Sequence, residues 1–134
     1  MLKLSKKVEY ALIAIRHMAI QGSSSVITAK IIAEKYFLSF ELLSKVLQLL
    51  VRNKIISSHQ GMHGGYTLIL KPEEISLLNI IHVIDGKTPG IVQCLESGDS
   101  ICSIQESCTI KSPLLKIQNN LEETFFSMKI SQII

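Results

Sequence analysis

The chain has 134 residues, of which 47% are hydrophobic, 19% are charged and three are cysteines, and its formal net charge is +3. This length fits one domain, or one domain with an attached helix, and the apolar content excludes a chain that is disordered by composition. No run approaches ~18 uncharged apolar residues, so we expect neither a membrane-spanning helix nor a membrane partner. The first residues lack the apolar core and cleavage site of a secretory signal, so we expect a cytoplasmic protein with reduced thiols.

Charge is unevenly distributed along the chain. Residues 1–71 contain ten Lys or Arg against three Asp or Glu, a net charge of +7, whereas residues 72–134 contain four against eight, a net charge of −4. A basic half is typical of a protein that binds a polyanion such as nucleic acid, although a mildly basic solvated face would give the same counts.

Two helices are predicted first. Ser5 is placed to cap a helix in which apolar residues recur every three or four positions, and the Gly- and Ser-rich stretch 21–25 ends it. Thr28 then begins a short second helix.

Ser39 is the predicted cap of a third helix, which ends near residues 52–54. Leu38 before this cap and Leu43 inside the helix have the spacing of a hydrophobic staple. The buried stripe of this helix is predicted to be Leu43, Val46, Leu47 and Leu50. The residues that it leaves pointing outward are Phe40, Glu41, Ser44, Lys45 and Gln48.

The hydrophobic period then changes from helix to strand. Residues 55–59 and 66–70 read as two short strands, joined by the hairpin loop 60–65. Three glycines in this loop permit positive φ angles and a close approach of the backbone to another molecule.

The acidic half begins with a short helix after Pro72 and another over residues 77–84, which the turn 85–90 ends. Ser112 and Pro113 are the predicted cap and first turn of a long amphipathic C-terminal helix. Such a helix often pairs with its copy in a homodimer, and the alternative is that it folds back on its own domain.

Helices followed by a hairpin in a basic half predict a mainly α fold, a winged helix-turn-helix with a two-stranded wing and a long C-terminal dimerisation helix. In this fold the third helix enters the major groove of double-stranded DNA and the wing contacts the backbone or the minor groove. Glu41 could accept from cytosine, Lys45 could donate to guanine, and lysines elsewhere could contact phosphates. The predicted DNA-binding residues are Lys3, Ser5, Lys6, Ser39, Phe40, Glu41, Ser44, Lys45, Gln48, His59, Gln60, Gly61, His63 and Gly64.

Three segments follow from this pattern. Residues 1–86 form the expected winged-helix DNA-binding domain, residues 87–111 a cysteine-rich loop, and residues 112–134 the dimerisation helix and tail. The sequence gives little support to an enzyme, because it has no phosphate-binding glycine loop between a strand and a helix and no nucleophile elbow.

All three cysteines lie in the polar loop, as Cys94, Cys102 and Cys108, where nothing looks like a core helix or strand. Thiolates are the preferred protein ligands of iron–sulfur clusters. Structural zinc usually takes four ligands, often in C-x2-C pairs that are missing here. The spacing is also compatible with oxidation of two thiols to a disulfide, and with cysteines that have no role.

The chain resembles the IscR–NsrR family of bacterial dimeric winged-helix transcription regulators, from residue 2 to about 128. The wing sequence GGY at residues 64–66 and the preceding helix LSFELLSKVLQLL at 38–50 carry most of this resemblance. The other similar segments are 3–12, 55–58, Gly61, Pro72, 75–77 and the Asp85–Gly86 pair.

This resemblance implies an iron–sulfur cluster, 2Fe–2S or 4Fe–4S, held by Cys94, Cys102 and Cys108. One branch of the family has a histidine ligand where this chain has Lys111. Another branch takes a carboxylate from the first helix of the partner subunit, and Glu9, before Tyr10, occupies that place. The resemblance therefore implies Glu9 as the fourth ligand, and the alternative is an ordinary exposed acid near a helix N-terminus.

The wing departs from its relatives, which often have an arginine where this chain has Gln60. Glutamine can still read a minor-groove acceptor, but it lacks the charge that narrow A·T grooves attract. The resulting hypothesis is a homodimeric repressor whose operator binding is controlled by its cluster, in response to redox state, nitric oxide or cluster supply. The alternative is a regulator of the same family without a cluster, acting through thiol oxidation or a partner protein.

Overall fold

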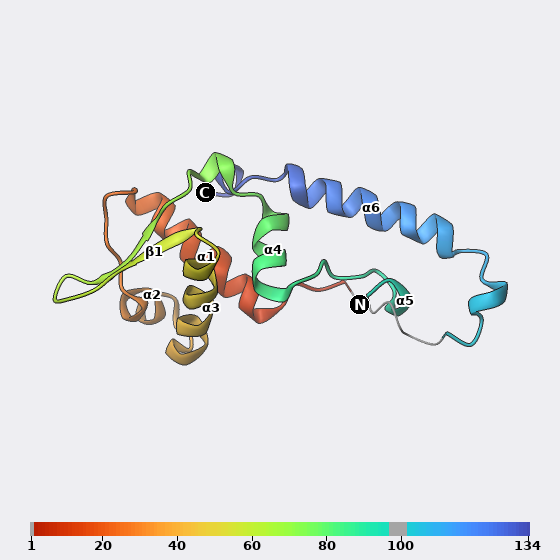
Figure 1. Cartoon of the computed structure of the whole chain (residues 1–134), viewed down its shortest axis with the longest axis horizontal. Helices are drawn as coiled ribbons and strands as arrows, with labels where there is room; N and C mark the ends of the chain where they lie inside the picture. The colour runs from red at the N-terminus through yellow and green to blue at the C-terminus, as the bar shows by residue number, and fades with distance from the viewer. Residues whose placement is uncertain (1, 97–101) are drawn as a thin grey trace.

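The computed structural model describes residues 2–96 and 102–134, which form an elongated molecule (Figure 1). The first part contains helices α1 (Lys6–Gln21), α2 (Ala29–Tyr36) and α3 (Phe40–Arg52), followed by strands β1 (Ile56–His59) and β2 (Gly65–Leu68). The second part contains α4 (Leu77–Asp85), α5 (Gln93–Glu96), α6 (Lys111–Ser127) and three 3₁₀ turns, Pro72–Glu74, Gln105–Ser107 and Ile130–Gln132. The predicted mainly α architecture with a two-stranded wing is confirmed.

Side-chain caps fix where the early helices begin. The hydroxyls of Ser5, Thr28 and Ser39 each accept a hydrogen bond from the backbone N–H three residues later, at 3.2, 3.2 and 3.3 Å. These bonds satisfy amide groups that have no partner within a helix, and they confirm the three predicted caps. The predicted Ser112 cap is wrong, because α6 already begins at Lys111 and has no side-chain cap.

A single apolar core holds the first part together. On α3, four apolar residues are fully buried, at the three- and four-residue spacing that places them on one face. Burying each of them contributes about 1.5–3 kcal/mol relative to an exposed position. They are Leu43, Val46, Leu47 and Leu50. Helix α3 packs against α1, α2, α4 and β1, and its residues Phe40, Glu41, Lys45 and Gln48 are exposed.

The wing is anchored to the turn before α2. Ile56 pairs with Leu68 at its base, and at its outer end His59 pairs with Gly65. Ile27 adds a third, one-residue bridge, with its N–H and C=O bonded to Tyr66 at 2.9 and 2.8 Å. Gly65 has a φ of +149°, and an added Cβ would lie 2.8 Å from the Ile27 carbonyl oxygen. Only glycine lets the wing approach that closely.

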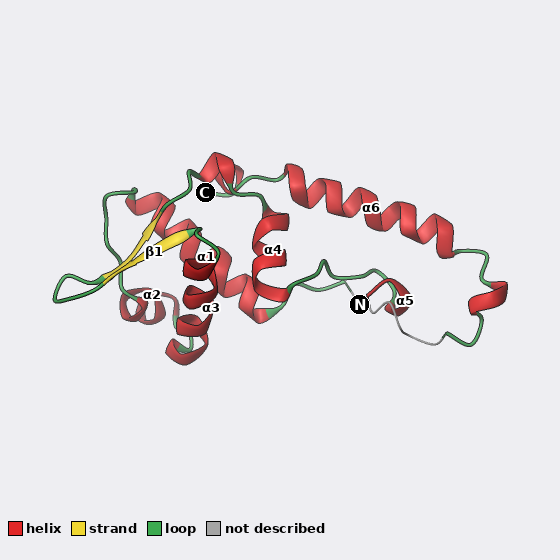
Figure 2. Ribbon diagram, viewed as in Figure 1, coloured by secondary structure: helices red, strands yellow, loops and turns green. Residues whose placement is uncertain are grey.

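Helix α6 extends away from this core, as Figure 2 shows, and contacts it through α4. In α6, all of whose residues are described, Gln118 alone is buried. The chain then returns to the core, where Ile130 is 1% exposed and its N–H donates to the Ile75 carbonyl at 2.9 Å. We call residues 2–86 and 128–134 the body, and residues 87–96 and 102–127 the arm.

The described residues around the cysteines include two short helical turns. Cys94 lies on the one-turn helix α5, and the 3₁₀ turn Gln105–Ser107 directly precedes Cys108. Both are single helical turns that the sequence did not predict, and neither is a core helix or strand. Sequence periodicity missed these elements because each spans a single turn, which is too short to repeat an apolar pattern. Residues 97–101, between Cys94 and Cys102, lie outside the described residues.

Candidate nucleic-acid interface and cysteine segment

The outer face of α3 carries exposed side chains, some of which form an ion pair or a hydrogen bond with other residues of the same helix. Lys45 and Glu41 form an ion pair at 3.5 Å, and the Ser44 hydroxyl donates to the Phe40 carbonyl at 2.8 Å. Ser39, Phe40, Glu41, Lys45 and Gln48 are exposed, whereas Ser44 is half-buried. An exposed ion pair contributes little to stability. The Glu41–Lys45 pair can therefore break when either side chain binds a group of another molecule.

A buried tyrosine fixes the start of α3. The phenol oxygen of Tyr10 accepts a hydrogen bond from the backbone N–H of Ser39 at 3.1 Å, and Tyr10 is only 8% exposed. This bond ties the N-terminus of α3 to α1. Tyr10 was not among the predicted functional residues, and the signal for it is an aromatic residue with a hydroxyl group among the apolar residues of the first helix.

Hydrogen bonds on one face of the wing orient His59. The Thr67 hydroxyl lies 2.9 Å from His59 Nε2 and 2.9 Å from the Ser57 hydroxyl. These contacts hold the His59 ring against the strands. At the wing tip, His59, Gln60, Gly61 and His63 are exposed and Gly64 is half-buried. The wing thus presents its predicted residues to solvent at the end of the molecule opposite the arm (Figure 1).

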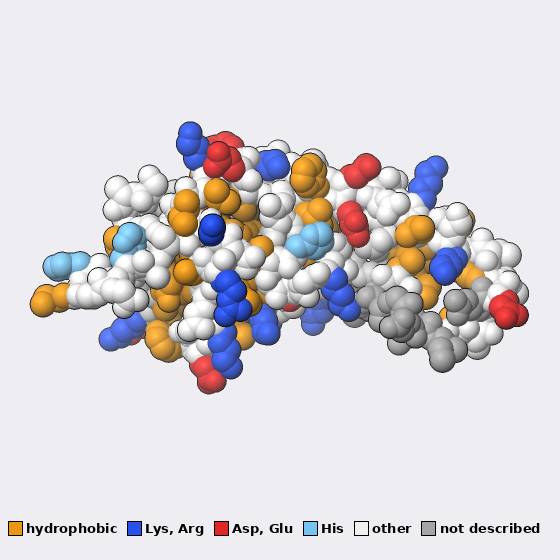
Figure 3. Space-filling model, in the orientation of Figure 1, with side chains coloured by type: hydrophobic (Ala, Val, Ile, Leu, Met, Phe, Trp, Pro, Cys, Tyr) orange, Lys and Arg blue, Asp and Glu red, His pale blue; other side chains and the backbone are white. Residues whose placement is uncertain are grey.

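Basic side chains lie around α2 and α3. Figure 3 shows Lys and Arg side chains along the lower edge of the body, beneath α2 and α3. Lys3 is exposed, and Lys6 is paired with Glu9 at 3.1 Å. Lys30, at the start of α2, is 77% exposed and 4.0 Å from Glu34. Lys30 was not among the predicted residues, although the sequence shows a lysine in the first turn of the helix before α3.

Ser5 has two partners within the chain. Its hydroxyl caps α1 and also donates to Asp85 Oδ1, at the end of α4, at 2.8 Å. A phosphate contact of Ser5 would compete with Asp85. This bond also links the start of α1 to the point where the arm leaves the body.

One histidine is part of the body's interior. His17 Nδ1 lies 2.8 Å from the Tyr36 hydroxyl, which joins α1 to α2, and the residue is 5% exposed. Burial, and secondarily the charge of Lys35, lower the pKa of His17 below its ordinary value of 6.5. The neutral imidazole is therefore the form that the folded body favours.

The three cysteines are free and half-buried. Among the described residues, which include all three and Glu9, no three His, Cys, Asp or Glu side chains lie close enough together to hold a metal ion. Three thiols have the right donor chemistry for an iron–sulfur cluster, but their described positions do not assemble a site for one. The predicted ligand set therefore stays a prediction.

Gln118 links the cysteine segment to α6. Its side-chain oxygen accepts from the Ile91 N–H at 3.0 Å, and its Nε2 donates to the Pro89 carbonyl at 3.2 Å. Buried amides of this kind hold a loop in one conformation because each unmade bond is costly. The segment that leads to Cys94 is thereby fixed to α6.

Comparison with known proteins agrees with this geometry. The family model Rrf2, described as an iron-dependent transcriptional regulator, matches residues 4–134. The chain belongs to the Rrf2 family. Among similar proteins, protein aau3 of Rhizobium meliloti is 26% identical over 133 residues, covering 99% of this chain and 85% of the relative. The NsrR regulator of Oceanobacillus iheyensis is 27% identical over 115 residues, covering 86% and 78%.

Solved structures agree with this Rrf2 assignment. CymR of B. subtilis, described as its global cysteine regulator, superposes with a TM-score of 0.77 at 25% identity and covers 99% of this chain and 96% of that one. IscR of T. potens superposes with a TM-score of 0.73 at 26% identity, covering 98% and 85%. The resemblance to the IscR–NsrR family and the winged-helix fold are confirmed, and the regulator names agree with a protein that is not an enzyme.

No helix among residues 2–96 and 102–134 is both long and apolar enough to cross a membrane.

Proposed function

We propose that this Rrf2 protein is a homodimeric repressor that binds double-stranded operator DNA through α3 and the wing. One observation carries the proposal: the solvent-facing side of α3 and the exposed wing tip belong to the same basic half of the chain. A rigid body that presents one helix and a hairpin outward is the arrangement with which winged helices contact the major groove and the backbone.

Contacts to DNA divide into two kinds in this proposal. Base edges are read by the outer residues of α3 and by Gln60 in the wing, because these side chains are exposed. Phosphates are contacted by lysines around the body, which supply affinity without sequence information. The proposed residues are Ser39, Phe40, Glu41, Ser44, Lys45, Gln48, His59, Gln60, Gly61, His63 and Gly64 for α3 and the wing, with Lys3, Ser5, Lys6 and Lys30 around them.

A second copy of the chain is proposed to cover α6. Leu115, Ile117 and Phe126 are 45%, 50% and 57% exposed, which leaves apolar area on a helix that extends away from its own core. Pairing of two such helices would set the spacing of the two α3 helices. An operator would then hold two half-sites related by the same twofold symmetry.

For control, we propose an iron–sulfur cluster held by Cys94, Cys102 and Cys108, with Glu9 of the partner subunit as the fourth ligand. The iron-dependent description of the family model and the three-thiol donor set support this. The thiols would have to come together from their described positions. A bound cluster would supply iron–sulfur bonds that oxidants or nitric oxide can break.

The chain's own residues offer a route from the cysteines to the DNA-binding face. Gln118 ties the segment before Cys94 to α6, and the Ser5–Asp85 bond ties the end of α4 to the start of α1. Helix α1 in turn holds the N-terminus of α3 through Tyr10. A movement of the cysteine segment would therefore reach α3 through contiguous hydrogen bonds and helices.

A clusterless regulator that acts through thiol oxidation is the second candidate. Two observations favour it: the described thiols do not converge on a metal site, and all three are partly accessible. A similar structure, covering 96% of this chain with a TM-score of 0.75 at 25% identity, is the oxidized form of CymR from Staphylococcus aureus.

Purification without oxygen separates these candidates. We expect visible absorbance with matched iron and sulfide, and selection of a palindromic site from a random duplex library. Substituting Cys102→Ser should abolish the absorbance and the response of DNA binding to nitric oxide, whereas the adjacent Ser103→Ala should change neither.

A colourless protein after reconstitution, with DNA binding that responds to oxidant, would support thiol oxidation instead. Failure to select any duplex sequence would contradict the repressor proposal itself.

A further inference from the structure

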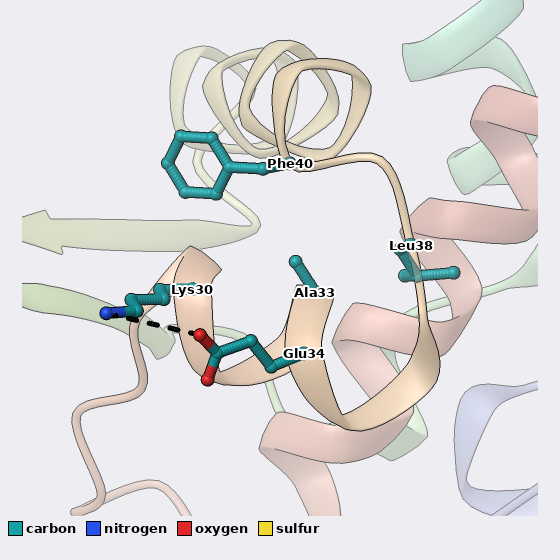
Figure 4. A pocket seen from close by; sticks show the side chains of 5 residues that line it. All are labelled: Lys30, Ala33, Glu34, Leu38 and Phe40. Atoms are coloured by element: carbon teal, nitrogen blue, oxygen red, sulfur yellow. Dashed lines mark ion pairs between the residues drawn. The ribbon is translucent and has the colours of Figure 1, made fainter.

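An open hollow lies between α2 and the first residue of α3. It has a volume of about 410 Å³ and is lined by Lys30, Ala33, Glu34, Leu38 and Phe40 (Figure 4). Ala33, Leu38 and Phe40 make its surface apolar, and the Lys30–Glu34 ion pair lies across one side of it. It is therefore an apolar recess with a charged border, next to the proposed DNA-binding face of α3.

Phe40 is the most unusual residue of this recess. It is the first residue of α3 and is 57% exposed, so its ring is not part of the core. The N-terminal residues of a recognition helix are those that contact base edges in the major groove. An exposed aromatic ring at this position would meet DNA before the polar residues deeper in the helix.

The neighbouring polar side chains are partly occupied within the chain. Glu41 and Lys45 are paired with each other, and the Ser44 hydroxyl is bonded to the Phe40 carbonyl. The Glu41–Lys45 pair is exposed and weak, so these groups stay available for hydrogen-bond readout, and the exposed ring of Phe40 adds an apolar contact beside them. This end of α3 can therefore make an apolar contact with DNA in addition to polar ones.

The major groove offers one apolar group, the 5-methyl of thymine. We propose that Phe40, at the edge of the apolar recess that Ala33 and Leu38 also line, forms a receptor for a thymine methyl, and that this contact sets a thymine preference in each half-site. The inference rests on the proposed DNA-binding function and adds the chemistry of one base position to it.

Lys30 complements this contact. Its pair with Glu34 spans 4.0 Å between side chains that are 77% and 69% exposed, so the pair is weak and solvent-screened. A phosphate next to the thymine can therefore replace Glu34 as the ion-pair partner of the Lys30 ammonium group. The recess would then be bounded by the phosphate backbone on one side and by the base edge on the other.

The test removes the methyl without altering base pairing. A duplex selected from a random library is resynthesised with deoxyuridine at each thymine in turn, symmetrically in both half-sites. We expect one position at which the loss of each methyl weakens binding about fourfold, the effect of removing one buried methyl-sized group. Replacing cytosine by 5-methylcytosine at a variant of that position should restore part of the affinity.

Two aromatic variants complete the experiment. Phe40→Ala should bind thymine and deoxyuridine duplexes equally, while Phe40→Leu should retain part of the preference. Phe37 is the matched control, because it is 95% exposed in the adjacent turn but does not line the recess. Phe37→Ala should therefore keep the full preference.

The outcomes separate the two proposals. Sequence-selective binding with no deoxyuridine effect at any position would overturn the methyl receptor and leave the repressor proposal intact. Equal loss of the preference in Phe37→Ala and Phe40→Ala would also overturn it. Absence of any sequence-selective binding would overturn the repressor proposal and this inference together. Circular dichroism of both variants checks that their helices are intact.

Discussion

The body and the arm of this protein are stabilised in different ways. The body buries a continuous apolar core, and the hydroxyl caps of its first three helices are all formed. In the arm, α6 buries a single side chain, the polar Gln118, and begins without a side-chain cap. Apolar burial stabilises a fold through many small contacts, whereas a polar link depends on a few bonds. The body is therefore held by its core, whereas the arm depends on α4 and on the bonds of Gln118.

The largest expected effect comes from the core of the body. Leu47 is fully buried on α3, so Leu47→Ala leaves a cavity and should lower the free energy of unfolding by about 2–5 kcal/mol. Urea denaturation followed by circular dichroism measures this change. The matched arm variant Ile104→Ala, at a residue 54% exposed, should stay within about 0.5 kcal/mol of the parent. Equal losses in the two variants would show that body and arm share one core.

Removing the polar link of the arm should have a smaller and more local effect. Gln118→Leu keeps the side-chain size but leaves the Ile91 N–H and the Pro89 carbonyl unpaired, at a cost of about 1–3 kcal/mol. Hydrogen exchange should show faster exchange at the Ile91 amide with unchanged protection in α3. The exposed neighbour Asn119→Ala is the control and should alter neither. Faster exchange throughout α3 would mean that the link also stabilises the body.

The Tyr10–Ser39 bond tests how the body positions α3. Tyr10→Phe removes the acceptor of the Ser39 N–H and should cost about 0.5–1.5 kcal/mol of stability, together with a loss of DNA affinity. Tyr36→Phe removes a hydroxyl bonded to His17, away from the α3 N-terminus. It should cost similar stability but leave the affinity for a selected duplex unchanged. Equal affinity losses would show that general destabilisation, rather than positioning, is responsible.

The smallest expected effect is a pH dependence of the body. Because burial lowers the pKa of His17, the unfolded chain binds a proton more tightly than the folded one, so protonation favours unfolding. The destabilisation should grow as the pH falls below the ordinary value of 6.5 and level off below the lowered pKa. Melting temperatures between pH 7.5 and 5, with His17→Gln as the reference, isolate this contribution. A difference between parent and variant that does not change with pH would contradict it.

Local features of the sequence determined most of the body. The caps at Ser5, Thr28 and Ser39 lie directly before the apolar repeats that they begin, and the buried stripe of α3 follows from a period of three to four residues. The wing follows from its glycines and the change to a strand pattern. Each of these signals acts over a few neighbouring residues, so the sequence by itself was sufficient to predict them.

Contacts between distant residues were decided only by the tertiary structure. Ser5 meets Asp85 across 80 residues, Gln118 meets Pro89 across 29, and the tail places Ile130 in the core of the body. The recess at Phe40 belongs to the same class. No local pattern encodes such pairs, because a hydrogen bond or an apolar contact depends on the positions of two surfaces that only the packed chain brings together.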